Sequence, residues 1–282
     1  MKKYGVFSLI GIVGIILIVL SACNKIAEGE MREEVGSAVP AWNGQYVLLE
    51  EFTGVRCPNC PSAAVIAKQL LSVYKDSLIV VALHPMGDFL TTPYVGDPDL
   101  RSEAADAYYD YYKVSALGLP TGMVNRGQAP GELLKKDLWR NAVSTYFPLI
   151  AVAQLTANAS FTGSTKEAFN VNINGKITGK YAKEGSLNLI VMVLEDSIVL
   201  QQNTPDGKIK GYMQNHVLRT TLDDPWGVKV LDSKPEKEAT FKKDYSDVAV
   251  NEKWNKAHLS VVVILSNETT KEVIQVAYTH IK

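Results

Sequence analysis

Apolar and polar positions alternate differently in the two halves of the chain. Between residues 42 and 148, apolar runs of strand length are followed by stretches in which apolar residues recur every three or four positions. That recurrence is the spacing of an amphipathic helix, whereas one-by-one alternation indicates a strand buried on one face. One-by-one alternation dominates between residues 149 and 282. The pattern therefore predicts an α/β domain over 42–148 and an all-β domain over 149–282.

The first half is expected to alternate between strands and helices. Strands are predicted at 46–52, 78–83 and 117–125, and helices at 61–75, from Asp97-Pro98 to about residue 112, and at 131–147. The second helix should bury one side made of Leu100, Ala104, Tyr108, Tyr111 and Tyr112, and the third a side made of Leu134, Leu138, Trp139 and Ala142.

The second half is expected to form an antiparallel β-sandwich. Strands are predicted at 153–161, 169–173, 187–194, 261–265 and 273–278, with 187–194 central because both of its faces are apolar. The segment 203–237 has the least regular pattern, and long loops on a rigid sandwich often bind partners. His216, Arg219 and Trp226 are the candidate contacts there, with the alternatives that His216 and Arg219 support the loop and that Trp226 completes the core.

The start of the chain indicates export. Lys2 and Lys3 precede an uncharged apolar stretch, and Leu20-Ser21-Ala22-Cys23 follows. These features describe a secretory signal peptide over residues 1–22, and the ending resembles a bacterial lipobox with Cys23 as the lipidated residue. An uncleaved anchor helix is the alternative. Polar residues 23–41 then form a tether, and lipid on Cys23 would hold the protein at a membrane surface.

Charge and motifs exclude several classes of function. The chain has a net charge of −1, and loss of Lys2 and Lys3 with the signal peptide takes it to −3, which argues against a nucleic-acid partner. No segment of the mature chain fits the phosphate-loop or the nucleophile-elbow pattern. The four histidines have no metal-ligand spacing with each other or with the cysteines, so we predict neither a metal site nor a cofactor.

The most informative motif is Cys57-Pro58-Asn59-Cys60, which lies between a predicted strand and a predicted helix. It could be a redox centre, half of a metal site or a structural disulfide. If Cys23 carries lipid, Cys57 and Cys60 are the remaining thiols, and outside the cytosol they are expected to be oxidised. A disulfide across two residues closes a very short loop and removes little chain entropy, which favours redox chemistry over a structural disulfide. A helix N-terminus lowers the pKa of a nearby thiol, and Arg56 could assist.

The order strand, CxxC at a helix start, strand, helix, and Leu119-Pro120-Thr121 entering a strand resembles the thioredoxin fold. The resemblance implies that Cys57 attacks, that Cys60 resolves, and that Pro120 is a cis proline opposite the pair. It also implies that Glu51 assists proton transfer at Cys60, whereas a solvated carboxylate at the strand end is the alternative. Thr53-Gly54 departs from the family, since many thioredoxins carry an aromatic residue there.

A narrower resemblance covers most of the mature chain. The lipobox, the segment from Glu51 to Pro61 and the later Asn215-His216-Val217-Leu218-Arg219 are similar to the Omp-28-related outer-membrane lipoproteins. This family implies a lipid-anchored protein on the periplasmic face or the cell surface, with a thioredoxin-like domain before a sandwich-like one. Two functions follow as alternatives: thiol–disulfide exchange with extracytoplasmic proteins, or binding of a surface ligand by an adhesion lipoprotein with a structural disulfide.

Overall fold

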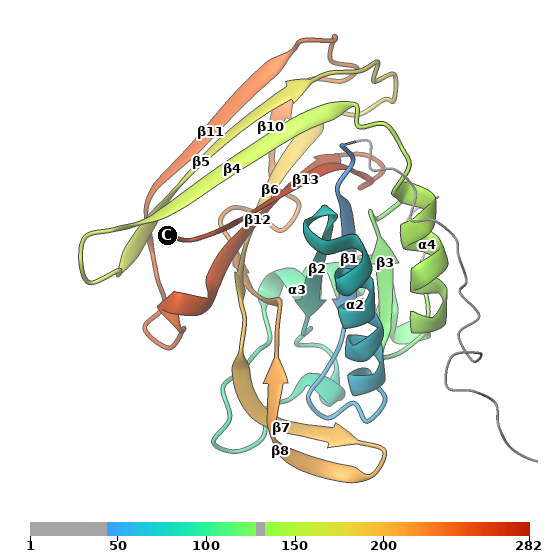
Figure 1. The fold of residues 1–282 in the computed structure, drawn as a ribbon, viewed down its shortest axis with the longest axis vertical. Coiled ribbons are helices and arrows are strands. Elements are labelled where there is room, and N and C mark those ends of the chain that lie inside the picture. Colours follow the sequence, from blue (N-terminus) through green and yellow to red (C-terminus); the bar gives the residue numbers. More distant parts are fainter. Residues whose placement is uncertain (1–43, 128–132) are drawn as a thin grey trace, which may run out of the picture. The chain divides into compact units, whose positions relative to one another are not determined.

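The computed structural model describes residues 44–127 and 133–282. The predicted signal peptide, the tether over 23–41 and the predicted lipid site at Cys23 lie outside the described residues. The fold combines a mixed α/β sheet with separate antiparallel sheets, as the sequence predicts (Figure 1).

A sheet of eight strands forms the centre of the fold. Strands β1 (Val47–Phe52) and β2 (Leu78–Leu83) are parallel, and β3 (Thr121–Val124) pairs with the other edge of β1 in the antiparallel sense. Strand β9 continues the sheet beyond β2, and β10 also pairs with β6. The strands contributed by the second half are β6 (Leu187–Glu195), β9 (Val217–Thr221), β10 (Val228–Leu231), β12 (Leu259–Asn267) and β13 (Val273–His280).

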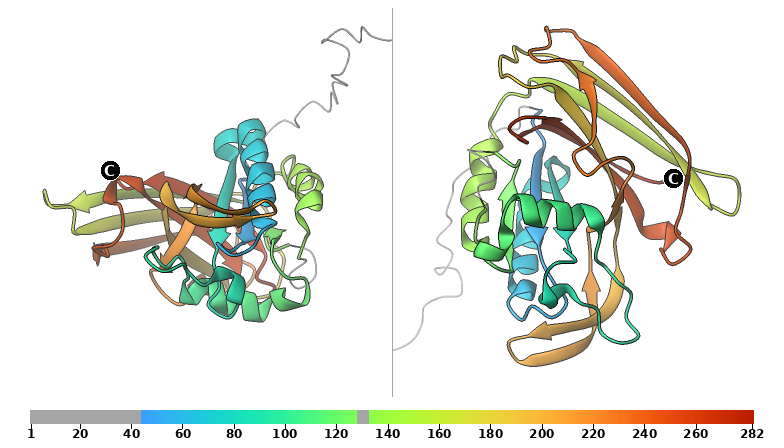
Figure 2. Two further views of the ribbon diagram at one scale, coloured as in Figure 1. Left: turned by 90° about the horizontal axis from the view of Figure 1, so that it is seen from below. Right: turned by 180° about the vertical axis from the view of Figure 1, so that it is seen from behind.

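Helices cover both faces of the part of the sheet formed by β1, β2 and β3. Helices α2 (Cys60–Tyr74) and α4 (Trp139–Tyr146) pack on one face, and α3 (Glu103–Tyr111) packs on the other (Figure 2). The alternation of β1 matches this arrangement, since Val47 and Leu49 face α2 and α4 whereas Leu48 faces the core beneath α3. The CxxC motif lies in the connection between the end of β1 and the start of α2, at one end of the sheet.

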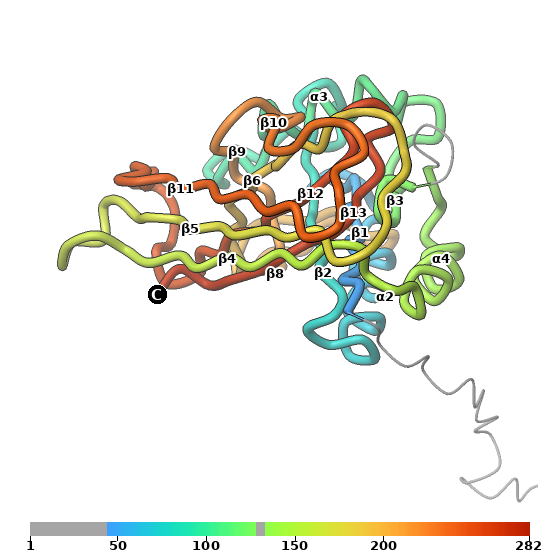
Figure 3. Tube along the Cα trace, turned by 90° about the horizontal axis from the view of Figure 1, so that it is seen from above, coloured from blue at the N-terminus to red at the C-terminus, as the bar shows by residue number. Residues whose placement is uncertain are grey.

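A second sheet packs against the β6–β12–β13 part of the first. Strands β4 (Ala153–Thr162), β5 (Ala168–Ile177) and β11 (Thr240–Ala249) form this layer, with β5 in the middle (Figure 3). Strand β6 is apolar on both faces because Leu189 and Val191 face this second sheet whereas Ile190 and Met192 face α3. A sandwich is therefore present, and one of its two layers is the extended thioredoxin-like sheet.

The two halves of the chain, on either side of the domain border expected between residues 148 and 149, share a sheet and a core. Strand β9, from the second half, pairs with β2 at Ala82 and Val217, and the core around α3 includes Met192 and Val262. The thioredoxin-like strands and the sandwich strands thus bury one common core, which periodicity along the chain does not reveal.

Three local predictions were wrong. Helix α3 begins at Glu103 because the Ser102 side chain accepts from the backbone N–H of Ala105, and its exposed face carries Tyr111 at 44 % exposure. Helix α4 begins at Trp139, and Leu138 before it is 51 % exposed. The segment 203–237, expected to be loops, contains β9, β10 and a further strand, β8 (Gly207–Gln214). Strand β8 forms a two-stranded hairpin with β7 (Ile198–Thr204).

Candidate functional site

The CxxC motif lies where β1 turns into α2. Cys57 and Cys60 form a disulfide with Cα atoms 5.4 Å apart. The first helical residue is Cys60 and the N-cap is Asn59, so Cys57 lies in the turn before the helix, where its N–H donates to the Gly54 carbonyl (3.1 Å). Both cysteines are buried, with exposures of 1 % for Cys57 and 2 % for Cys60.

Close packing of the preceding loop explains the departure from the thioredoxin pattern at Thr53-Gly54. A Cβ atom at Gly54 would lie 2.5 Å from the carbonyl oxygen of Leu90, and the same oxygen accepts from the Arg56 N–H at 2.8 Å. The 89–92 segment therefore occupies the space that an aromatic side chain at this position would need.

The β7–β8 hairpin holds the other side of the CxxC loop. Gln202 is 1 % exposed, and its Nε2 lies 3.1 Å from the carbonyl oxygens of both Gly54 and Cys57. Asn203 donates from its backbone to Val55 (2.8 Å) and from its side chain to the Arg56 carbonyl (3.0 Å). Four successive carbonyls, from residue 54 to residue 57, thus accept from two neighbouring residues of β7.

The contacts of the Arg56 side chain indicate a structural role rather than a purely electrostatic one beside the sulfur. Its Nε donates to the Thr92 carbonyl at 2.7 Å and its Nη2 to the Pro93 carbonyl at 3.0 Å. The guanidinium also lies 4.2 Å from the ring centroid of Tyr94, whose hydroxyl donates to Asn203. Arg56 therefore ties the CxxC loop to the 89–94 segment.

Pro120 lies at the same end of the sheet as the disulfide loop. The Leu119–Pro120 peptide bond is cis, as the thioredoxin resemblance implies. Thr121 pairs with Phe52, the last residue of β1, so the sheet register brings Pro120 to the edge from which the CxxC loop leaves.

Glu51 is the most unusual group of the site. The period of two along β1 directs it toward α2, together with Val47 and Leu49. Its exposure is 4 %, its Oε1 accepts no hydrogen bond, and burial raises its pKa from the usual 4.5 to about 8. A solvated carboxylate at the strand end is therefore not what the structure shows.

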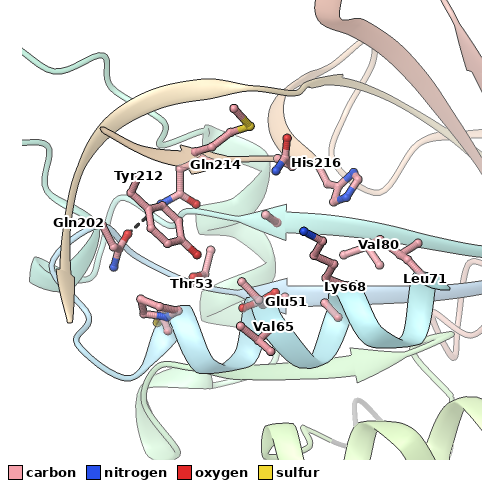
Figure 4. Close-up of a pocket in the computed structure, with 17 residues that line it drawn as sticks. Glu51, Thr53, Val65, Lys68, Leu71, Val80, Gln202, Tyr212, Gln214 and His216 are labelled. Carbon is pink, nitrogen blue, oxygen red and sulfur yellow. Dashed lines mark hydrogen bonds between the residues drawn. The ribbon is translucent and has the colours of Figure 1, made fainter. Parts of the chain in front are cut away.

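Glu51 and Cys60 share a cavity of about 490 Å³ between α2 and the hairpin (Figure 4). Helix α2 contributes Lys68, β2 contributes Val80, and the hairpin contributes Tyr212 and Gln214. Figure 4 shows the Tyr212 hydroxyl directed toward Thr53 and Glu51. Burial, and next the charge of Glu51, raise the pKa of Tyr212, which is consistent with this proximity.

The three residues predicted to contact a partner, His216, Arg219 and Trp226, all make contacts within the protein. Arg219 has its Nε 3.4 Å from Glu195, and its side chain is 11 % exposed. Trp226 packs on Tyr108, with ring centroids 5.0 Å apart, at the edge of the core beneath α3. His216 lines the cavity, and its backbone N–H donates to Asp196 (2.6 Å).

The sequence of residues 105–282, more than half of the chain, matches the family described as outer membrane protein Omp28. The chain belongs to the Omp28 family. Membership places it among outer membrane proteins.

One solved structure supports the fold of this Omp28 family member, and a second is less similar. HBP35 of Porphyromonas gingivalis has 16 % identity and a TM-score of 0.66, over 86 % of this chain and 76 % of that one. A domain of the outer membrane lipoprotein Omp28 from the same organism has 21 % identity and a TM-score of 0.33, over 48 % of this chain and 91 % of that one. A search of curated proteins finds no match. The first likeness shows the thioredoxin-like fold and carries no statement about activity.

The Omp28 match begins at residue 105 and does not include the CxxC motif. Within residues 44–127 and 133–282, no helix is both long and apolar enough to cross a membrane. In the same residues, no group of three or more His, Cys, Asp or Glu side chains could hold a metal ion.

Sequence reasoning missed the contribution of the hairpin to the site. Gln202, Tyr212 and Gln214 lie more than 140 residues after Cys57 and have no motif of their own. One signal was present, since Asp206-Gly207 between two alternating runs is a hairpin turn sequence. That signal predicts the hairpin, but not where it packs.

Proposed function

We propose that this Omp28 family member is held at the outer membrane by lipid on Cys23 and exchanges disulfides with extracytoplasmic proteins through Cys57 and Cys60. Support comes from the lipobox-like sequence before Cys23, the thioredoxin-like fold and the oxidised CxxC pair.

One observation carries the redox proposal: Glu51, a buried acid with an unpartnered oxygen, lines the same cavity as Cys60. An unpartnered buried polar atom destabilises a fold, so its presence at this place favours a chemical role. A pKa of about 8 lets Glu51 hold or release a proton near neutral pH, which suits an acid–base group.

The reaction begins with Cys57 and Cys60 reduced. The Cys57 thiolate attacks one sulfur of a client disulfide, an S–S bond forms between them, and the second client sulfur leaves as a thiolate. Cys60 gives its proton to ionised Glu51 and attacks the Cys57 sulfur. The 57–60 disulfide then forms and the first client sulfur leaves, so that two electrons pass to the client. In the reverse direction, protonated Glu51 returns the proton to Cys60.

Two neighbours of the pair act by positioning. Arg56 fixes the CxxC loop through the carbonyls of Thr92 and Pro93. Pro120, at the end of the sheet where β1 finishes, shapes the groove in which the client chain would lie.

The test follows reduction of a model protein disulfide by the reduced protein. We expect turnover in the wild type, none in Cys57→Ser, and a rate lower by about 100-fold in Glu51→Gln, the size of one acid–base contribution. Glu252→Gln, a change at an exposed glutamate, should keep the wild-type rate. Absence of turnover in the wild type would contradict the proposal.

A second candidate is a surface-binding lipoprotein in which the disulfide is structural. The cover over the pair favours this function, since both cysteines are buried and Gln202 is bonded to the loop that carries them. In that case the double change Cys57→Ser/Cys60→Ser keeps ligand binding, and changes within 203–237 remove it. His216 is the first position to change, since its side chain is 34 % exposed against 11 % for Arg219. The opposite pattern would exclude this candidate.

A further inference from the structure

The cavity beside Cys60 has the size of a small-molecule site. Its volume of about 490 Å³ lies within the roughly 300–1,000 Å³ of typical ligand pockets. Ala64, Val65 and Leu71 of α2 form an apolar wall, and Val80 and Ala82 of β2 extend it. A small molecule can enter a space of this volume.

Only one of the two cysteines faces this space. Cys60 lines the cavity, whereas Cys57 does not, and the Cys57 carbonyl is held by Gln202 under the hairpin. Thiolate attack on a disulfide sulfur proceeds through a mixed disulfide and depends on access to the attacked sulfur. Cys60, which is 2 % exposed, is the cysteine of the pair that borders the cavity, so a thiol bound there would approach the disulfide from the Cys60 side.

The charges around the cavity favour an anionic ligand. Burial raises the pKa of Glu51 to about 8 and lowers that of His216, with Asp196 opposing the latter shift, so both groups are largely neutral at pH 7. Burial also raises the pKa of Tyr212, which stays protonated. The ammonium of Lys68 is therefore the full charge among the lining side chains, and Figure 4 shows it extending from α2 toward His216.

We propose that this cavity binds a low-molecular-mass thiol that carries a carboxylate, and that this thiol exchanges with Cys60 to reset the pair. The proposal rests on the proposed function and names the co-reactant that the function requires. The carboxylate pairs with Lys68, and the apolar wall of α2 receives the carbon chain.

The exchange balances with two molecules of the thiol. The first thiolate attacks the Cys60 sulfur, a mixed disulfide forms there, and Cys57 leaves as a thiolate that takes up a proton. The second thiolate attacks the ligand sulfur of the mixed disulfide and releases the small disulfide. Cys60 leaves as a thiolate and receives the proton of Glu51, so two thiols supply the two electrons that reduce the pair.

The test compares three thiols of similar size and different charge as reductants of the oxidised protein: 3-mercaptopropionate, 2-mercaptoethanol and cysteamine. Each rate is divided by that thiol's rate with a model disulfide in free solution, which removes differences in intrinsic nucleophilicity. We expect the anion to react fastest and the cation slowest. Lys68→Gln should reduce the ratio of anion to cation by about two- to fivefold, the size of one partly exposed charge pair. Lys253→Gln, at an exposed lysine in the turn before β12, should not change it.

A second measurement locates the reacting sulfur. Cys57→Ser should form a mixed disulfide at Cys60 with the disulfide of 3-mercaptopropionate, identified by mass. Equal normalised rates for the three thiols, or an unchanged ratio in Lys68→Gln, would overturn the cavity proposal even if the protein still reduces a model protein disulfide. Small-thiol exchange without protein turnover would keep the cavity proposal and remove the client step, and loss of both reactions would overturn both proposals.

Discussion

Two adjacent glutamates of β1 differ because a strand sends neighbouring side chains to opposite faces. Glu50 faces α3 and accepts from Arg126, with Nε to Oε2 at 2.7 Å and Nη2 to Oε1 at 2.5 Å. Both side chains of that pair are fully buried. Glu51 faces α2 and forms no ion pair with any residue that the structure describes, and burial raises its pKa to about 8, so that it holds its proton at neutral pH. The first glutamate is neutralised by a partner and the second by protonation.

This difference predicts a pH dependence of stability that Glu51→Gln removes. The pKa of Glu51 is about 8 in the folded protein against a usual 4.5, so the folded state binds the proton more tightly. The stability it contributes is fully present below pH 4.5 and is lost as the pH rises through 8. Between these values, the free energy of unfolding of the wild type should fall relative to Glu51→Gln by about 1.4 kcal/mol per pH unit.

Urea unfolding of both oxidised proteins between pH 5 and pH 8 measures this difference. Parallel curves over that range would show that the Glu51 carboxyl is already ionised in the folded protein.

At the scale of elements, the β7–β8 hairpin covers the loop that carries the CxxC motif. Two residues of β7 donate to the CxxC loop, and Gln214 of β8 donates from Nε2 to Gln202 Oε1 at 2.8 Å. The hairpin thereby forms one wall of the cavity and the cover over Cys57. Access to the disulfide is set by this element rather than by the cysteines themselves.

Gln202→Ala should loosen this cover. The change removes the Gln202 donor from the carbonyls of Gly54 and Cys57, which keep the N–H groups of Cys57 and Cys60 as donors, so we expect the free energy of unfolding to fall by about 1 kcal/mol. Reduction of the disulfide by a neutral phosphine should become faster. The neighbouring Gln201→Ala is the control, since the contact of Gln201 with Asp97 is made by its backbone N–H. Equal reduction rates in the two variants would show that Gln202 does not hold the cover.

At the scale of the whole molecule, the eight-stranded sheet joins both halves of the chain in one core. Residues of β6, β9 and β12 extend the apolar surface beneath α3 that β1 and β2 begin in the same sheet. The face of β6 on the other side belongs to the sandwich. A strand buried on both faces by different halves makes the unfolding of one half depend on the other.

Met192→Ala tests this dependence. Met192 is fully buried in the core beneath α3, so the truncation should lower the free energy of unfolding by about 2–5 kcal/mol. Far-ultraviolet and near-ultraviolet circular dichroism should show one transition that shifts as a whole. Met213→Ala, at a methionine that is 52 % exposed, should shift it little. Two separate transitions, of which only one moves, would mean that the halves unfold independently.

Local patterns in the sequence determined the elements with strong periodicity. Strand β2 lies at the predicted residues 78–83, and the alternating run at 153–161 and the apolar run at 187–194 are strands. The placement of CxxC between a strand and a helix followed from the pattern around the motif, whereas the cis proline was implied by the resemblance to the thioredoxin fold. These features depend on neighbours within a few residues, which is the information a sequence carries directly.

Only the tertiary structure decided what surrounds the cysteine pair and where the halves meet. Gln202, which covers Cys57, belongs to a strand far along the chain. The cavity in which the Glu51 oxygen lacks a partner is likewise completed by residues of that hairpin. The pairing of β9 with β2 likewise joins segments 135 residues apart, at Ala82 and Val217. Such contacts are selected by burial of a shared apolar surface, which depends on the packing of whole elements and leaves no periodic trace in the sequence.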